Sequence, residues 1–114
     1  MLHTIETPRL RLRKITFEDL DFLLELFNSK AMEYYGIIRS REETVEWISF
    51  TNRNYSEYGF GKYLIQRKSD NIKMGHAGFS PIHVAGRMEL ELGYFLHPAY
   101  WRRGYATEAA SHLR

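Results

Sequence analysis

The sequence contains no cysteine, only three prolines and no apolar run of membrane-spanning length. The absence of cysteine excludes disulfide bonds, thiol catalysis and cysteine-based zinc sites. A transmembrane helix needs about 20 consecutive apolar residues, so no membrane partner is expected. The amino terminus also lacks a basic region followed by an apolar stretch, so it shows no secretory signal. These absences are compatible with a reducing cytoplasm, where we expect the protein to reside.

The chain also has little excess of either positive or negative charge. The 16 Lys and Arg residues against 14 Asp and Glu residues give a net charge of +2, which does not indicate nucleic-acid binding. With 44% hydrophobic and 26% charged residues, the 114-residue chain has the composition of one globular domain. No metal site is predicted, because metal-ligand spacing is missing from the five histidines, His3, His76, His83, His97 and His112.

The first half of the chain predicts a strand followed by two helices. Residues 9–13 alternate Arg and Leu, the pattern of a half-buried strand, and we expect its arginine face to be solvated. The segment 16–29 opens with a Thr-x-x-Asp variant of the capping box, which predicts a first helix. The segment 40–58 opens with a Ser-x-x-Glu box and is followed by two glycines, which predicts a second helix.

The second half predicts three strands and a final helix. The strands are expected at 62–67, at 72–79 and at 88–96, where apolar residues alternate with Glu and Gly until a proline ends the pattern. From Gly104 onward the alanine-rich sequence favours a helix, inside which the chain stops. This order of elements is typical of the α+β class.

The junction between the last strand and the last helix has the composition of an anion site. The first turn of a helix offers free N–H groups and a partial positive charge. Gly104 and Ala106 keep that turn free of bulk, Arg102 and Arg103 add charge, and Thr107 adds a hydroxyl. The pattern suits a diphosphate. The alternative is that the glycine only eases a turn and the arginines are solvated.

Two separate motifs resemble one known family. The segment 101–109, Trp-Arg-Arg-Gly-Tyr-Ala-Thr-Glu-Ala, resembles the pyrophosphate loop of GNAT acetyltransferases, with Trp at the general Gln/Arg position as in RimJ/RimL-like members. The segment 6–13, Glu-Thr-Pro-Arg-Leu-Arg-Leu-Arg, followed by Glu18 and Asp19, resembles the start of the same branch. The resemblance implies a GNAT fold: a mixed, mostly antiparallel sheet with helices on both faces. Residues 1–114 would then form a single GNAT domain that is incomplete at its carboxyl end.

The resemblance also implies acetyl-CoA as the co-substrate. In the family, the backbone of the strand before the loop pairs with the pantetheine arm, here near Phe95 and Leu96. The loop amides hold the pyrophosphate, and they belong here to Arg102, Arg103, Gly104, Tyr105, Ala106 and Thr107.

Glu91 is the implied general base, which takes a proton from the acceptor amine through water, and Glu89 is its fallback. Glu91 could instead pair with an arginine of a neighbouring strand or bind the substrate ammonium. Tyr34 and Tyr35 stand in the segment that borders the acceptor pocket in relatives, although ordinary packing explains them equally well. No residue of the chain matches the family's acid for the leaving thiolate.

The implied activity is transfer of acetyl from acetyl-CoA to a primary amine, with a ribosomal or other protein amino terminus as the favoured acceptor. A small-molecule amine is the enzymatic alternative. Because the carboxyl-terminal half of the family fold is missing from the sequence, a non-catalytic CoA-binding or protein-interaction module is the third interpretation. The unpaired edge of the 88–96 strand predicts homo-oligomer formation through that edge.

Overall fold

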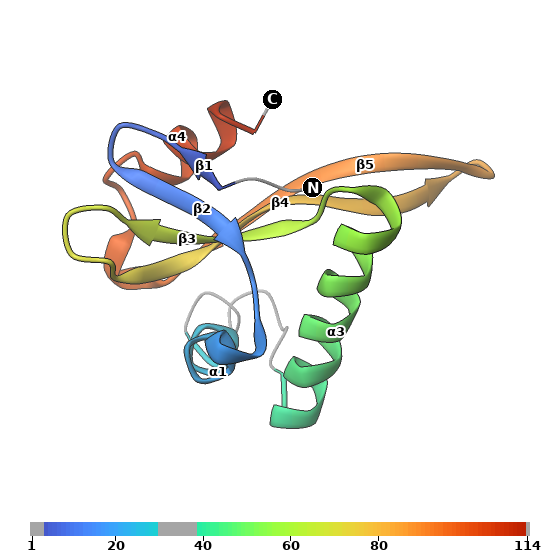
Figure 1. The fold of residues 1–114 in the computed structure, drawn as a ribbon, viewed down its shortest axis with the longest axis horizontal. Coiled ribbons are helices and arrows are strands. Elements are labelled where there is room, and N and C mark those ends of the chain that lie inside the picture. The colour runs from blue at the N-terminus through green and yellow to red at the C-terminus, as the bar shows by residue number, and fades with distance from the viewer. Residues whose placement is uncertain (1–3, 30–38, 114) are drawn as a thin grey trace.

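The structure is a computed structural model, and it describes residues 4–29 and 39–113. Its centre is an antiparallel sheet with the strand order β1-β2-β3-β4-β5 (Figure 1). The strands are β1 Ile5–Glu6, β2 Leu10–Lys14, β3 Lys62–Arg67, β4 Lys73–Val84 and β5 Arg87–Leu96. Helices α1 and α3 cover one face of the sheet and α4 covers the other; their bounds are Leu20–Phe27, Arg41–Tyr58 and Tyr105–Ser111. The predicted α+β class is confirmed.

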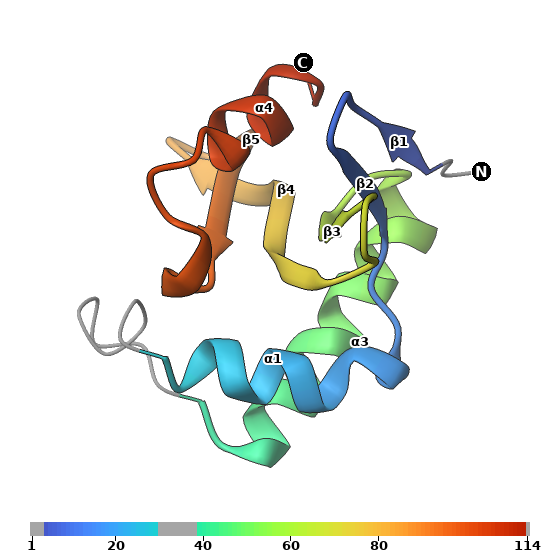
Figure 2. The ribbon, with the colours of Figure 1, turned by 90° about the vertical axis from the view of Figure 1, so that its left-hand side faces the viewer.

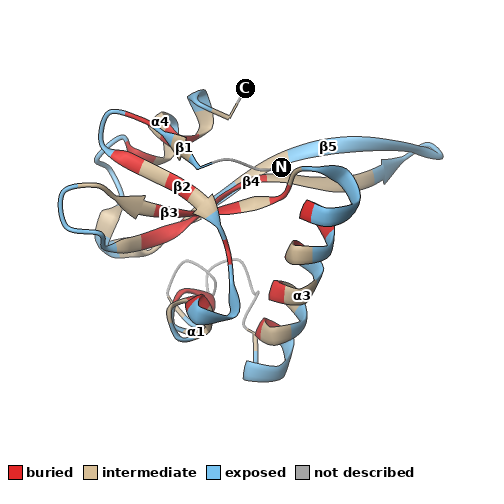
Figure 3. Cartoon of the chain, in the orientation of Figure 1, coloured by how far each residue is buried: buried red, intermediate tan, exposed pale blue. Residues whose placement is uncertain are grey.

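Two hydrophobic clusters hold these layers together. Alternation along β3 points Tyr63 and Ile65 toward α4 and points Leu64 toward α1 and α3. Figure 2 shows α1 and α3 crossing on one side of the sheet while α4 lies beside the first strands on the other side. The buried residues gather in the middle of the sheet, where helices cover both faces (Figure 3).

Both predicted capping boxes are present. The Ser40 hydroxyl accepts from the Glu43 amide at 3.1 Å, and the Glu43 carboxylate accepts from the Ser40 amide at 2.9 Å. The first helix differs in detail from its prediction, because a 3₁₀ turn at Phe17–Asp19 precedes α1 and α1 ends at Phe27. Gly59 ends α3 in the left-handed conformation, with φ of 75°. No helix within residues 4–29 and 39–113 is long and apolar enough to cross a bilayer.

Asp19 does more than cap its helix. Its fully buried carboxylate accepts from the Arg13 guanidinium at 2.9 Å, from Lys73 Nζ at 2.7 Å and from the Thr16 amide at 2.9 Å. Burial opposes ionisation, but the bonds from Arg13 and Lys73 outweigh it and hold the pKa of Asp19 below its usual value. Asp19 therefore joins β2, β4 and the start of α1. The expectation that the arginine face of β2 is solvated is wrong for Arg13.

Strands β4 and β5 form a long hairpin that extends beyond the helices (Figure 1). The turn at Ala85 and Gly86 is left-handed at both positions, with φ of 51° and 78°, which suits a tight hairpin. β4 is longer than the predicted 72–79 strand because it continues to Val84 as the partner of β5. The outer hairpin is exposed on both faces, so Met88 and Leu90 are each 48% exposed rather than buried on an apolar face.

Candidate functional site

The loop between β5 and α4 has an unusual backbone. Arg102 and Gly104 both have positive φ, at 64° and 78°, a conformation that glycine tolerates and arginine rarely adopts. The indole Nε1 of Trp101 donates to the Leu96 carbonyl at 2.9 Å. This bond ties the start of the loop to the end of β5.

The loop presents a row of unused amide donors. The first backbone bond of α4 runs from the Glu108 amide to the Gly104 carbonyl at 3.0 Å. Within the described part of the chain, no backbone carbonyl accepts from the amides of residues 102–107. Gly104 and Thr107 are exposed, and Gly104 and Ala106 carry nothing larger than a methyl group. These amides fit a diphosphate, because free N–H groups at a helix start bind anions.

The six predicted loop residues contribute unequally. Arg102 and Arg103 are exposed, as a charge contact requires. Tyr105 is only 7% exposed, because its ring packs in the cluster between α4 and the sheet and its hydroxyl accepts from Arg67 at 3.4 Å. Tyr105 can therefore offer a cofactor only its backbone amide. Ala106 is half-buried against the same cluster.

Glu108 fixes this loop to the amino-terminal segment. Its side chain, 12% exposed, accepts from the Thr7 hydroxyl at 2.5 Å, from the Arg9 amide at 2.8 Å and from Arg9 Nε at 2.7 Å. Burial opposes ionisation of Glu108, but the bonds from Thr7 and Arg9 outweigh it and lower the pKa of the carboxyl. The first turn of α4 is thus held against the beginning of β2.

Arg9 holds the loop by two further contacts. Its guanidinium donates to the Arg103 carbonyl at 3.0 Å and lies 4.3 Å from the centre of the Tyr105 ring. Arg9 is exposed as expected, with 45% of its side chain accessible, but it also makes these specific contacts. No local pattern predicted these contacts of Thr7, Arg9 and Glu108, because the partners are distant in sequence. Arg9 and Glu108, for example, are 99 residues apart. They belong to the two motifs that carried the family resemblance, and the structure shows these motifs in contact.

The end of β5 presents Leu96 rather than Phe95 at its outer edge. The His97 amide donates to the Met74 carbonyl at 2.8 Å, and Leu96 stands opposite Gly75. Because neighbouring residues of an antiparallel strand direct their backbone groups to opposite sides, Phe95 faces β4 and Leu96 faces outward. The Leu96 carbonyl is occupied by Trp101, so its amide is the group that can pair with an extended ligand.

Glu91 lies on the exposed part of β5, opposite Ser80 of β4. Its side chain is on the same sheet face as α1 and α3, which cover that face nearer the end of β5. No arginine or lysine nitrogen of the described residues lies within 4.0 Å of its carboxylate, so the alternative interpretation, a pair with an arginine, is wrong among these residues. Its charge acts on Lys62, whose pKa is lowered by burial and raised to a lesser extent by Glu91. Glu91 is therefore free to contact a substrate. Glu89 is exposed two residues closer to the hairpin tip.

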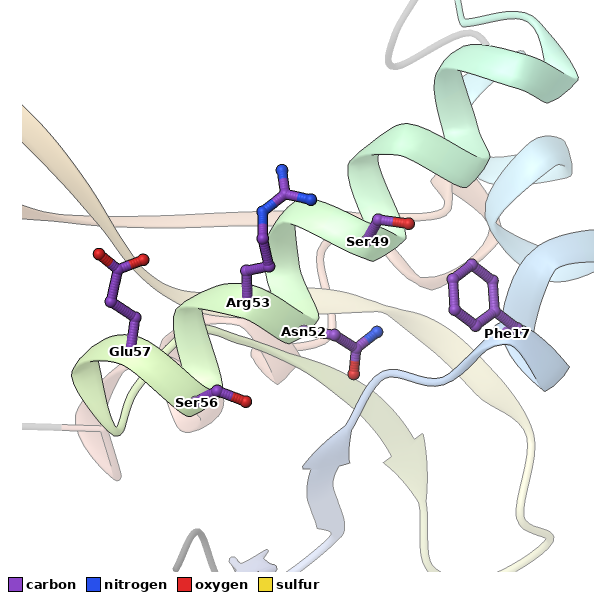
Figure 4. A pocket seen from close by; sticks show the side chains of 6 residues that line it. All are labelled: Phe17, Ser49, Asn52, Arg53, Ser56 and Glu57. Carbon is purple, nitrogen blue, oxygen red and sulfur yellow. The ribbon is translucent and has the colours of Figure 1, made fainter.

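Other predicted features give less information. Tyr34 and Tyr35 lie outside the described residues. Within the described ranges, no group of three His, Asp or Glu side chains is placed to hold a metal ion. A hollow of about 540 Å³ lies between α3 and Phe17, far from the loop, and Figure 4 shows Phe17 beside Ser49 and Asn52 of that helix. It shares no lining residue with the predicted site.

The site thus combines a sheet edge, a loop with left-handed residues and a helix start with free amides, and its family follows from comparison with known proteins. The acetyltransferase (GNAT) domain family matches residues 9–114. This chain belongs to the GNAT acetyltransferase family. Membership confirms the GNAT fold that the two motifs predicted.

Individual GNAT relatives support this assignment. The chain is 32% identical over 114 residues to the uncharacterized N-acetyltransferase YoaA of Bacillus subtilis strain 168, covering 97% of this chain and 64% of the relative. The crystal structure of an acetyltransferase from Agrobacterium tumefaciens strain C58 superposes with a TM-score of 0.84 at 25% identity, covering 100% of this chain and 66% of that one. The chain spans less than two thirds of the length of the first curated relatives that it matches.

A third similarity concerns the fold alone. The structure of RimL, a ribosomal L7/L12 alpha-N-protein acetyltransferase in complex with coenzyme A, has a TM-score of 0.78 at 19% identity. It covers 97% of this chain and 65% of its own. The GNAT assignment is thus firm, whereas the RimJ/RimL subtype stays a prediction.

Proposed function

We propose that this protein transfers the acetyl group of acetyl-CoA to a primary amine. The proposal rests mainly on the amides of residues 102–107, which donate to no backbone carbonyl among the described residues and which Glu108 and Arg9 hold at the end of β5. Acetyl-CoA supplies a thioester whose carbonyl carbon the amine nitrogen attacks, so that a C–N bond forms and the C–S bond breaks. The loop amides bind the pyrophosphate and the Leu96 amide pairs with the pantetheine arm. These contacts supply catalysis through orientation.

Glu91 is the proposed general base. Its carboxylate is exposed and unpaired among the described residues, and it lies on the same strand that carries Leu96. It would accept the proton that the amine loses, through a water molecule, and a positioned base contributes about 10²–10⁴-fold. The protein's own residues thus bind the cofactor at one end of β5 and remove the proton further along it.

The proposed acceptor is a protein amino terminus. Support comes from the two motifs shared with RimJ/RimL-like enzymes and from fold neighbours described as acetyltransferases of ribosomal L7/L12. A small-molecule amine remains the alternative. Acetyl-CoA turnover measured with a set of peptides and a set of small amines separates the two acceptor classes. Binding of CoA without any acetylated product would contradict the enzymatic proposal and support a non-catalytic module.

Gly104→Asp is expected to weaken acetyl-CoA binding about 10- to 100-fold. The new side chain adds bulk and negative charge where a diphosphate must approach the amides. The measurement is isothermal titration calorimetry with acetyl-CoA. Gly86→Asp is the matched control, because Gly86 has the same φ of 78° but lies at the hairpin tip with nothing within 4 Å. Equal dissociation constants for the two variants would remove the loop from the cofactor site.

Glu91→Gln is expected to lower kcat at least tenfold while the dissociation constant of acetyl-CoA changes little. The amide keeps the size of the side chain but cannot accept the proton. The pH–rate profile of the variant should lose its acidic limb. Glu89→Gln serves as the neighbouring control, and an unchanged profile in Glu91→Gln would transfer the base role to another residue.

We further propose that the protein acts in the cytoplasm, which cell fractionation tests, and that it self-associates through β5. The outer edge of β5 is unpaired among the described strands, and Met88, Leu90 and Tyr94 beside it are about half exposed. An open edge with apolar neighbours favours pairing with another chain. Light scattering at micromolar concentration should show a species larger than a monomer, and a stable monomer would contradict this assembly.

A further inference from the structure

Two cations on the α1/α3 face of the sheet differ from the other buried or half-buried cations of the protein. Arg13, Arg67 and Lys73 each contact a carboxylate within 3.0 Å. Lys62 and Arg39 have no carboxylate within 4.0 Å among residues 4–29 and 39–113. Burial lowers the pKa of both groups, and the charges of Glu91 on Lys62 and of Glu43 on Arg39 raise it only to a lesser extent. Each charge therefore carries a desolvation cost that no direct ion pair offsets.

A buried histidine on the same face of the sheet also lacks hydrogen-bond partners. His76 is fully enclosed, at 3% exposure, and neither ring nitrogen has a hydrogen-bond partner in the described structure. Its ring packs among aromatic rings, with centroids 5.0 Å from Trp47 and 5.6 Å from Phe95. A buried polar atom without a partner is rare and costs free energy, which a bound ligand would recover.

The strand register places Lys62 and His76 together. In the strand register, Lys62 of β3 stands opposite Gly78 of β4, and Gly78 stands opposite Gly93 of β5. The Lys62 side chain extends across these two glycines. Its Nζ donates to the Gly78 carbonyl at 3.3 Å, and a Cβ at position 93 would lie 2.7 Å from that nitrogen. His76 stands two residues before Gly78 and therefore points to the same face.

Arg39 approaches from the segment before α3. Its guanidinium lies 4.6 Å from the centre of the Phe27 ring, and that ring lies 6.0 Å from His76. Burial chiefly, and then the charges of Lys62 and Arg39, lower the pKa of His76 to about 3. All three groups therefore share one electrostatic environment, and His76 is neutral at physiological pH.

We propose that Lys62, His76 and Arg39, here called the basic cluster, bind a carboxylate of the acceptor, so that the preferred substrates are acidic amines. A carboxylate can accept from an ammonium, from a guanidinium and from an imidazole N–H, so it is the ligand group whose chemistry suits all three side chains. Glu91 lies on the same face and attracts the acceptor ammonium. The inference rests on the proposed acetyl transfer and adds the charge of the acceptor.

The test compares acceptors that differ by one carboxylate. Two pairs are used: the peptides Ser-Asp-Ala-amide and Ser-Asn-Ala-amide, and free serine against serinamide. Binding is measured by calorimetry in saturating CoA, and kcat/KM is measured with acetyl-CoA. The acidic member of at least one pair should bind about tenfold more tightly and react with a correspondingly higher kcat/KM, as expected for charge-assisted hydrogen bonds.

Variants connect this preference to the basic cluster. Lys62→Met keeps the length of the side chain but removes the charge, and it should abolish the preference, whereas Lys62→Arg should retain it. Lys68→Met is the control, because Lys68 lies just beyond β3 and pairs with Glu6 at 2.8 Å. Thermal melting verifies that each variant folds. The His76 ring resonances should shift on adding the acidic peptide and not on adding its amide counterpart.

The outcomes separate the inference from the proposed function. Equal binding of both members in both pairs, or a preference that survives in Lys62→Met, would overturn the carboxylate site and leave acetyl transfer intact. Tight binding of the acidic member with no acetylated product would instead overturn acetyl transfer and support the basic cluster. Binding of neither member of either pair would overturn the inference as well.

Discussion

Gly75→Ala is expected to destabilise the protein by about 3 kcal/mol, a large part of the stability of a domain of this size. A Cβ at this position would lie 2.0 Å from the Phe95 carbonyl oxygen and 2.9 Å from the Leu96 Cα. Both atoms belong to the backbone of β5, so the methyl group can be accommodated only if the two strands separate. That separation would occur at the end of β5 that leads into the cofactor loop.

The free energy of unfolding, measured by chemical denaturation, tests this expectation. Gly93→Ala is the matched control in the same hairpin, because its Cβ would meet only the flexible end of Lys62, at 2.7 Å. The control should lose less than about 1 kcal/mol, since a long side chain can move aside. If both variants unfold at the same denaturant concentration as the parent, the close approach of β4 and β5 is not present in solution.

Asp19→Asn is expected to cost about 3 kcal/mol at neutral pH. The carboxylate is completely buried and bonded to Arg13, Lys73 and the Thr16 amide. An amide of the same size leaves two partly buried cations without their counter-ion, which is the expensive way to break a buried ion pair. Asp21→Asn is the control, because its side chain is 96% exposed and should change stability little.

The dependence of stability on pH gives a second readout for Asp19. A carboxyl whose pKa is lower in the folded protein stabilises the fold above its unfolded pKa, near 4, and loses this effect as pH falls through the folded value. The parent should therefore lose stability below about pH 4 more steeply than Asp19→Asn. His76 lowers the stability of the folded protein already below about pH 6.5. The unfolded chain binds a proton there, whereas the folded ring stays neutral down to about pH 3. This loss of stability due to His76 should be the same in the parent and in Asp19→Asn.

Local signals in the sequence predicted most elements of the fold. The two capping boxes located the helix starts, because a cap is a contact between residues three positions apart. The strand at 62–67 and the loop at 101–109 were equally visible from local patterns. β1 was missed because two residues carry no periodicity. The outer half of β4 was missed because it is strand only through its pairing with β5.

The site was less predictable because its key contacts are distant in sequence. Nothing near Arg9 indicates that it bonds Glu108, and nothing near Asp19 indicates Lys73. Lys62 stands in an ordinary strand pattern, and His76 drew notice only as a histidine without metal spacing. Their burial and missing partners become visible only in three dimensions. The roles of Glu91 and the loop stay predictions that the variants above test, and the role of the Leu96 amide also stays a prediction.

The bond between Arg9 and Glu108 also has a consequence for biosynthesis. The two residues are 99 positions apart, so the segment around Arg9 can dock only after Glu108 has left the ribosome. Closing so large a loop costs entropy before any contact repays it, which slows folding. The turn that would receive acetyl-CoA is therefore completed late, and a nascent chain gains this anion-binding surface only when the rest of the sheet is already in place.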